Sequence, residues 1–244
     1  MEVDVLYSEA GDADFAQGLF EEALENYEQA LRANPQCVAA LVGRGKIYLE
    51  YEDYGKAKKD AKRAMDLAPE NSSAWTLSGN VRRCESDFDG AVHDLTQALS
   101  LDETNLLARY SRGIAYDLLG QPEAALADFD ESLRRAPDFV YAWYDRGVLL
   151  TEEGRLSDAL ESYSRALDLD PEFYECLVTR GDVHTVLKQY KEAEADFNKA
   201  IQIAPQQGTA WYYRALLRDE MGKQTEANAD YEQARRLGYS EDDL

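Results

Sequence analysis

The sequence has few of the residues on which most catalytic and metal-binding sites depend. It holds two histidines, at 93 and 184, and three cysteines, at 37, 84 and 176, which are far apart and form no CxxC pair. No HExxH pattern and no Cys–His–Asp spacing occurs. Scattered, odd-numbered cysteines are typical of a reduced cytoplasmic protein with inert thiols. We therefore predict no enzyme, no metal site and no cofactor.

Positive charge is also scarce. Lys and Arg number 26 against 48 Asp and Glu, a formal net charge of −22. Nucleic acid is a polyanion bound through clustered Lys and Arg, so it is a disfavoured partner. The acidity favours a neutral or basic partner, or serves solubility alone.

Long apolar runs are missing as well. No stretch of about 18 apolar residues exists, the length that a membrane-spanning helix needs. The opening residues, MEVDVLYSEAGDADF, carry acids in place of the basic segment and apolar run of a secretory signal. We predict no membrane association and a cytoplasmic location.

Glycine and proline are few, 15 and 6, but they are regularly spaced. A small residue recurs every 34 residues, at Gly11, Gly45, Gly79, Gly113, Gly147, Gly181 and Ala215. Alanine follows twelve residues later, at Ala23, Ala57, Ala91, Ala125, Ala159, Ala193 and Ala227. Proline closes five of the units, at Pro35, Pro69, Pro137, Pro171 and Pro205. A register kept without one insertion indicates an array of repeats.

Each unit reads as two amphipathic helices. In the unit that starts at Val140, no breaker occurs before Gly154, which predicts a first helix (helix A) from Val140 to about Glu153. A second helix (helix B) is predicted from about Ser157 to Asp168, before Asp170-Pro171 stops it. The chain is therefore expected to be all-α.

This pattern resembles the tetratricopeptide repeat family. Besides the small residues and the proline, it carries a large residue at unit position 4, such as Trp75, Trp143 and Trp211, and an aromatic residue at position 24, such as Phe129 and Tyr163. Arg109 and Glu103 depart from the family's position 4 and its closing proline. The resemblance covers seven units of one solenoid over residues 1–244: 4–37, 38–71, 72–105, 106–139, 140–173, 174–207 and 208–241. It implies a right-handed superhelical α-solenoid of antiparallel helix pairs, with the A helices lining a concave groove and polar caps at the ends.

Arginine recurs at unit position 7, where the family usually has an apolar residue. Aspartate recurs at position 23 of helix B, and four units hold both: Arg44 with Asp60, Arg112 with Asp128, Arg180 with Asp196, and Arg214 with Asp230. Because an unpaired buried charge is costly, we interpret these as structural ion pairs. Pairing within a unit and pairing between units both fit the sequence. Arg146 has Ser162 in place of its own Asp, so its expected partner is Asp128. The alternative role for these arginines is binding an acidic ligand.

Helical spacing places positions 2, 5, 9, 12 and 13 of each helix A on the side of the groove. The predicted groove residues are Asn80, Leu107, Tyr110, Ile114, Tyr141, Tyr144, Val148, Val178, Tyr212 and Leu216. Position 9 of the sixth unit is Asp182, and further acids, among them Glu152, border this stretch. Tyrosine suits recognition surfaces because it combines a large contact area with a polar tip. Alternatively, the tyrosines pack only against neighbouring A helices.

The family's best-known ligand mode grips a peptide's terminal carboxylate with Lys and Asn at groove positions 5 and 9. Here only Lys46, Asn80 and Arg83 are of suitable type, and they are not in the motif's order, so acidic chaperone tails are disfavoured. We predict a non-catalytic scaffold whose groove binds an apolar, partly basic peptide segment of a partner protein. The alternative is a structural solenoid that self-associates through its ends, with no groove ligand.

Overall fold

The computed structural model describes residues 3–239, and every regular element in that range is an α-helix. The chain separates into two compact units, residues 1–135 and 136–244. The first contains α1 (Val3–Ala16), α2 (Phe20–Ala33), α3 (Val38–Glu50), α4 (Tyr54–Leu67), α5 (Ser72–Cys84), α6 (Phe88–Leu101), α7 (Leu106–Leu118) and α8 (Pro122–Arg135). The second contains α9 (Val140–Glu152), α10 (Leu156–Leu169), α11 (Tyr174–Val186), α12 (Tyr190–Ile203), α13 (Gly208–Glu220) and α14 (Gln224–Arg236).

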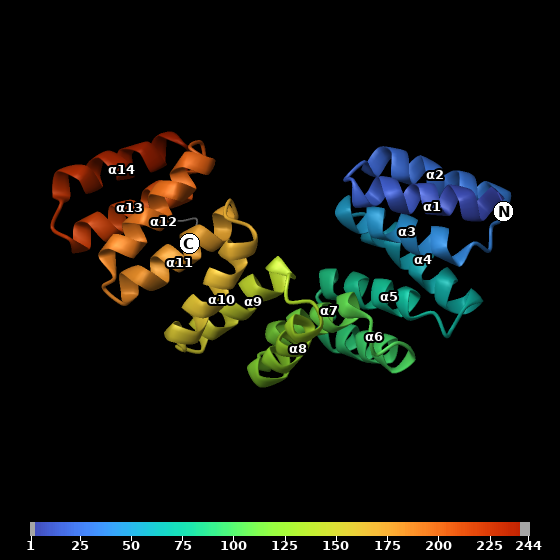
Figure 1. The fold of residues 1–244 in the computed structure, drawn as a ribbon. Helices are drawn as coiled ribbons and strands as arrows, with labels where there is room; N and C mark the ends of the chain where they lie inside the picture. The colour runs from blue at the N-terminus through green and yellow to red at the C-terminus, as the bar shows by residue number, and fades with distance from the viewer. Residues whose placement is uncertain (1–2, 240–244) are drawn as a thin grey trace. The chain divides into compact units, whose positions relative to one another are not determined.

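Consecutive helices pack in pairs, one A helix with the B helix that follows it (Figure 1). The helices predicted in the fifth repeat correspond to α9 and α10, with bounds that differ by about one residue. The all-α, α-solenoid prediction is confirmed. The predictions of one continuous solenoid and of its superhelical hand concern how the two units sit, and they stay predictions.

The turn between A and B helices has one fixed requirement. Unit position 15 has a positive φ in all seven repeats: glycine at 18, 120, 154 and 222, and Glu52, Ser86 and Lys188 in the others. Glycine adopts this left-handed conformation without the steric cost that a side chain brings. The repeats that carry Glu52, Ser86 or Lys188 at this position therefore have a local backbone strain that the four repeats with glycine avoid.

The small residues of the repeat let each A helix approach its B helix closely. All seven alanines at unit position 20 have no exposed surface. A Cβ atom added to Gly147 would lie 2.6 Å from Tyr163 Cε1, and one added to Gly113 would lie 2.8 Å from Phe129 Cε1. The position-24 ring of helix B thus occupies the space that a larger position-8 residue would need.

Arg109, which departs from the repeat pattern, makes the same hydrogen bond as the tryptophans it replaces. Trp75 Nε1 donates to the carbonyl oxygen of Pro69 at 2.8 Å, and Trp143 Nε1 donates to that of Pro137 at 2.9 Å. Arg109 Nη2 donates to the carbonyl oxygen of Glu103 at 2.9 Å. The donor and the acceptor keep their unit positions although both residue types have changed.

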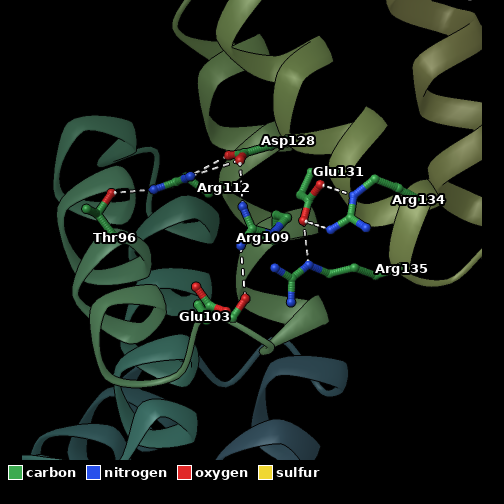
Figure 2. A network of polar contacts seen from close by, with 8 residues as sticks. All are labelled: Thr96, Glu103, Arg109, Arg112, Asp128, Glu131, Arg134 and Arg135. Atoms are coloured by element: carbon green, nitrogen blue, oxygen red, sulfur yellow. Dashed lines mark hydrogen bonds and ion pairs between the residues drawn. The ribbon is translucent and has the colours of Figure 1, made fainter.

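Three position-7 arginines, Arg112, Arg180 and Arg214, donate hydrogen bonds to two successive B helices. Arg112 donates from Nε and Nη2 to both carboxylate oxygens of Asp128, at 2.7 and 2.8 Å, and from Nη1 to Thr96 of the preceding repeat at 3.1 Å (Figure 2). Arg180 repeats this arrangement with Asp196 and Ser164. The carboxylate partner therefore comes from the same repeat and a neutral acceptor from the one before. Such two-pronged contacts fix the helices geometrically as well as electrostatically.

The other repeats keep or modify this contact. Arg44 and Arg214 each make the two-pronged bond, to Asp60 and Asp230 respectively. Arg146 donates to the hydroxyl of Ser162 at 2.6 Å, in its own repeat. Its expected pairing with Asp128 would join the two compact units and stays a prediction.

Candidate functional site

The predicted groove residues fall into both compact units. Four belong to the first unit: Asn80, Leu107, Tyr110 and Ile114. Six belong to the second: Tyr141, Tyr144, Val148, Val178, Tyr212 and Leu216. The predicted groove tyrosines gather in the second unit, which holds Tyr141, Tyr144 and Tyr212.

Four aromatic rings follow one another across α9, α10 and the start of α11. Tyr141 is 60% exposed, and its ring centroid lies 5.6 Å from that of Phe173. Phe173 lies 4.9 Å from Tyr144, and Tyr144 lies 6.1 Å from Tyr163, centroid to centroid. These separations are favourable for tilted ring contacts. The series runs from an exposed tyrosine to a buried one.

Tyr144 is half-buried within this series. Burial raises the pKa of the Tyr144 phenol to about 12, so it stays protonated and can donate or accept a hydrogen bond at neutral pH. Tyr144 packs against neighbouring rings and keeps some accessible surface, and its role in recognition stays a prediction.

A cavity of ≈ 190 Å³ lies beside the buried end of the series. We call it the Tyr163 cavity. It is lined by Val148, Thr151, Glu152, Tyr163, Val178, Thr179, Asp182 and Tyr213. Three successive A helices, α9, α11 and α13, contribute to it, and each contacts the next. Two predicted groove residues, Val148 and Val178, thus meet in one hollow.

Hydroxyl groups give this cavity polar points. Tyr163 Oη and Thr151 Oγ1 lie 3.0 Å apart and share a hydrogen bond. Thr179 Oγ1 donates to the carbonyl oxygen of Glu175 at 2.9 Å. With the two valines, these groups produce an apolar hollow with a few placed polar atoms, the usual composition of a ligand site.

Asp182 is a carboxylate that lines the cavity and whose pKa is shifted by its surroundings. Burial, with a further contribution from the charge of Glu220, raises the pKa of the Asp182 carboxyl above its ordinary value. The pKa of the Tyr213 phenol is raised by burial and by Asp182. Perturbed acids in a hollow are typical of functional sites.

Two predicted groove residues lie elsewhere than beside the cavity. Tyr212 is only 9% exposed and packs against Tyr239 and Tyr231 at the end of the chain, with centroids 4.9 and 5.7 Å away. Tyr212 packs against α14 of its own helix pair and against the residues that follow α14, so its side chain is covered even though helical spacing places it on the groove side. Leu216 is 37% exposed and does not line the cavity.

Sequence reasoning missed Tyr163, Thr151, Thr179 and Tyr213 as lining residues. Thr179 and Tyr213 share unit position 6, which the groove assignment left out. Tyr163 sits at position 24, which reads as pure core, and it is only 1% exposed. The hydroxyl groups of these four residues were the sequence signal that could have indicated a polar lining.

Cys176 is a buried free cysteine on α11. Burial raises the pKa of the Cys176 thiol to about 12, which keeps it in the unreactive protonated form. Among residues 3–239, no group of three or more His, Cys, Asp or Glu is arranged to hold a metal ion. In the same range, no helix combines the length and hydropathy that crossing a bilayer demands.

A family model described as "Tetratricopeptide repeat" matches residues 8–72, 78–138, 119–172 and 144–208. These ranges cover well over half of the sequence, and the chain belongs to the tetratricopeptide repeat family.

Individual relatives are similar over shorter stretches. The BBSome complex member BBS4 of Xenopus tropicalis is 35% identical over 91 residues, 37% of this chain and 17% of that protein. Hsc70-interacting protein 1 of Drosophila melanogaster is 30% identical over 88 residues, 36% of this chain and 23% of that protein. The chain thus spans less than a quarter of the length of these relatives.

A solved structure of a tetratricopeptide repeat protein from Parabacteroides merdae is similar along nearly the whole chain. The match has a TM-score of 0.65 and 19% sequence identity, and it covers 99% of this chain and 96% of that one. At this identity the likeness shows the fold alone.

Proposed function

We propose that this protein is a non-catalytic, cytoplasmic interaction scaffold that binds a peptide segment of a partner protein through the second unit. The observation that carries the proposal is the Tyr163 cavity at the buried end of an aromatic series whose other end, Tyr141, is exposed. Membership of the repeat family and relatives named for chaperone interactions support a protein partner. One fold hosts many functions, and the function of a particular protein depends on the geometry and chemistry of its site.

The chemistry of the surface favours an apolar segment with basic residues. Tyr141 offers an exposed ring and the cavity offers valine walls, both suited to an apolar anchor. The cavity also holds two carboxylates, Glu152 and Asp182, on a chain with a net charge of −22. An acidic segment would be repelled here, and a basic one would be attracted over a Debye length of about 8 Å at physiological salt.

Selection from a phage-displayed library of random dodecapeptides tests this function. Wild type is expected to enrich related peptides, and Val148→Lys, which places a long side chain at a half-buried lining position of the cavity, is expected to lose them. Leu169→Lys is the matched control, since it places the same side chain in the same unit at a 43% exposed leucine that does not line the cavity. Equal enrichment on Val148→Lys and wild type would contradict the proposal.

Self-association through the ends is the second candidate, and one observation favours it. Helix α1 exposes an apolar stripe at helical spacing: Val3 is 58% exposed, Leu6 55% and Tyr7 36%. In the second repeat the equivalents of Leu6 and Tyr7, which are Ala40 and Leu41, are buried in clusters with Ala30 and Leu31 of the preceding helix α2. A second copy of the chain would cover the stripe of α1 in the same way.

Sedimentation velocity over a wide concentration range separates the two candidates. Self-association predicts a size that grows with concentration and a return to monomer in Leu6→Lys. A wild type that stays monomeric at the highest concentration would eliminate this candidate and leave the groove as the proposed working surface.

A further inference from the structure

Asp182 lacks the arginine that recurs beside the position-23 aspartates of the B helices. Asp128, Asp196 and Asp230 each receive an arginine at 2.7–2.8 Å. Within residues 3–239, the Asp182 carboxylate accepts no hydrogen bond and forms no ion pair. A carboxylate in a hollow without a donor costs stability, so its presence calls for another explanation.

The groups that face Asp182 make the lack of a partner more pronounced. Glu152 from α9 lines the same cavity. Glu220 from α13 interacts with Asp182 electrostatically and raises its pKa, and Tyr213 from α13 stands beside it. From α10, Tyr163 contributes a phenol whose pKa burial raises, so it carries no charge at neutral pH. Each of these neighbours is an acid or a neutral phenol.

We propose that the Tyr163 cavity receives a cationic side chain, lysine or arginine, from the bound peptide segment, with its charged head at Asp182. This inference rests on the proposed function and names the ligand chemistry of that same site. The apolar stem of either side chain would pack between Val148 and Val178. The faces of Tyr163 and Tyr213 suit a cation, which is attracted to aromatic rings.

The hydroxyls of the cavity fit the several donors of such a head group. Lysine carries three N–H donors and arginine five, and neither accepts a hydrogen bond. Thr151 Oγ1 and Tyr163 Oη already satisfy one another, and each oxygen keeps a lone pair for a further donor. An anionic head group would instead meet Asp182 and Glu152 and find no cation lining the cavity.

The test repeats the dodecapeptide selection on wild type and on Asp182→Asn in parallel. Asn keeps the shape of the side chain and removes its charge. Asp117→Asn is the control, because Asp117 also has a pKa raised by burial, on α7 of the first unit and outside the cavity. Both variants change the net charge of the chain by the same amount, so a difference between them is local.

Wild type and Asp117→Asn are expected to enrich a lysine or arginine flanked by apolar residues, and Asp182→Asn is expected to lose that preference. For one enriched peptide measured by fluorescence polarisation, Asp182→Asn should weaken binding about tenfold or more. Replacing the basic residue of the peptide by norleucine should weaken binding to wild type equally and leave binding to Asp182→Asn unchanged. Binding should also fall as the pH is lowered through the raised pKa of Asp182.

Two results overturn the inference, and they differ in what they leave standing. Enriched peptides that lack a basic residue, or that bind Asp182→Asn as tightly as wild type, refute the cation pocket and leave the peptide-binding function intact. No enrichment of any peptide on wild type removes the proposed function and the inference with it.

Discussion

Substituting Asp128 by alanine tests whether the recurring Arg–Asp contacts hold the helix pairs together. Asp128 is 4% exposed and accepts two hydrogen bonds from Arg112 at 2.7 and 2.8 Å. Arg109 Nη1 lies a further 3.7 Å from the same carboxylate. The alanine variant would leave two arginines of the first unit without their shared counter-charge.

The expected loss is large but below that of a fully buried pair. Removing one partner of a buried ion pair costs about 3–5 kcal/mol, because the remaining charge is uncompensated. The Arg112 and Arg109 side chains are 18% and 14% exposed, so water reaches part of each guanidinium. We expect Asp128→Ala to lower the free energy of unfolding by about 2–4 kcal/mol.

Glu131→Ala is the matched control on the same helix. Glu131 also accepts from two arginines, Arg134 and Arg135, each at 2.6 Å (Figure 2). These three side chains lie at the surface, where ion pairs contribute little. The control therefore loses the same number of arginine contacts and should shift the unfolding midpoint far less.

Urea unfolding followed by tryptophan fluorescence measures both variants. Of the three tryptophans only Trp75 belongs to the first unit, so a Trp143→Phe, Trp211→Phe background makes the signal report on that unit. Adding Arg112→Leu to Asp128→Ala should recover part of the loss, since it removes an unpaired charge. Equal urea midpoints for Asp128→Ala and Glu131→Ala would contradict the expectation that the buried contact of Asp128 stabilises the fold more than the surface contact of Glu131.

Three further predictions concern single positions of the second unit. Gly147→Ala should lower the free energy of unfolding by about 1–3 kcal/mol, since its Cβ would overlap Tyr163; an unchanged urea midpoint would contradict the close approach. Asp182→Asn should stabilise the protein at neutral pH, because burial and Glu220 raise the pKa of that carboxyl and so disfavour its ionised form in the folded state. That gain should vanish in thermal melts as the pH falls through the raised pKa toward the ordinary value, and a gain that is constant with pH would count against it. Lys188→Gly should stabilise the turn by about 0.5–1 kcal/mol, since Lys188 has a φ of 58°; a lower melting temperature would count against this.

The helix boundaries and the pairing of helices within each repeat could be predicted from the sequence, because both follow from local rules. A 34-residue register of glycine, alanine and proline fixes where helices begin, end and touch, and each repeat meets chiefly its neighbours. Even Arg109 obeys the register, since it replaces a tryptophan donor with a guanidinium donor to the same carbonyl position. Arg109 departs from the apolar pattern of position 4, but the side chain at that position also donates a hydrogen bond, and arginine can donate it.

The candidate site was less predictable because it depends on packing between successive pairs. Helical spacing places Tyr212 on the groove side, yet Tyr239 and Tyr231 cover it. The same spacing treats Tyr163 as core, although its hydroxyl reaches a cavity. Helical spacing gives the direction of a side chain around its own helix axis. It does not give the position of the neighbouring helices, which decides which side chains stay exposed to solvent.

The most direct test of the central claim is to map a library-selected peptide onto the protein by NMR. On isotope-labelled protein, we expect chemical-shift changes centred on Val148, Thr179 and Asp182 as the peptide is titrated in. The Asp182→Asn variant should show weaker binding with the same map. Changes confined to α1, or to α12 and α14, would contradict a ligand site at the Tyr163 cavity.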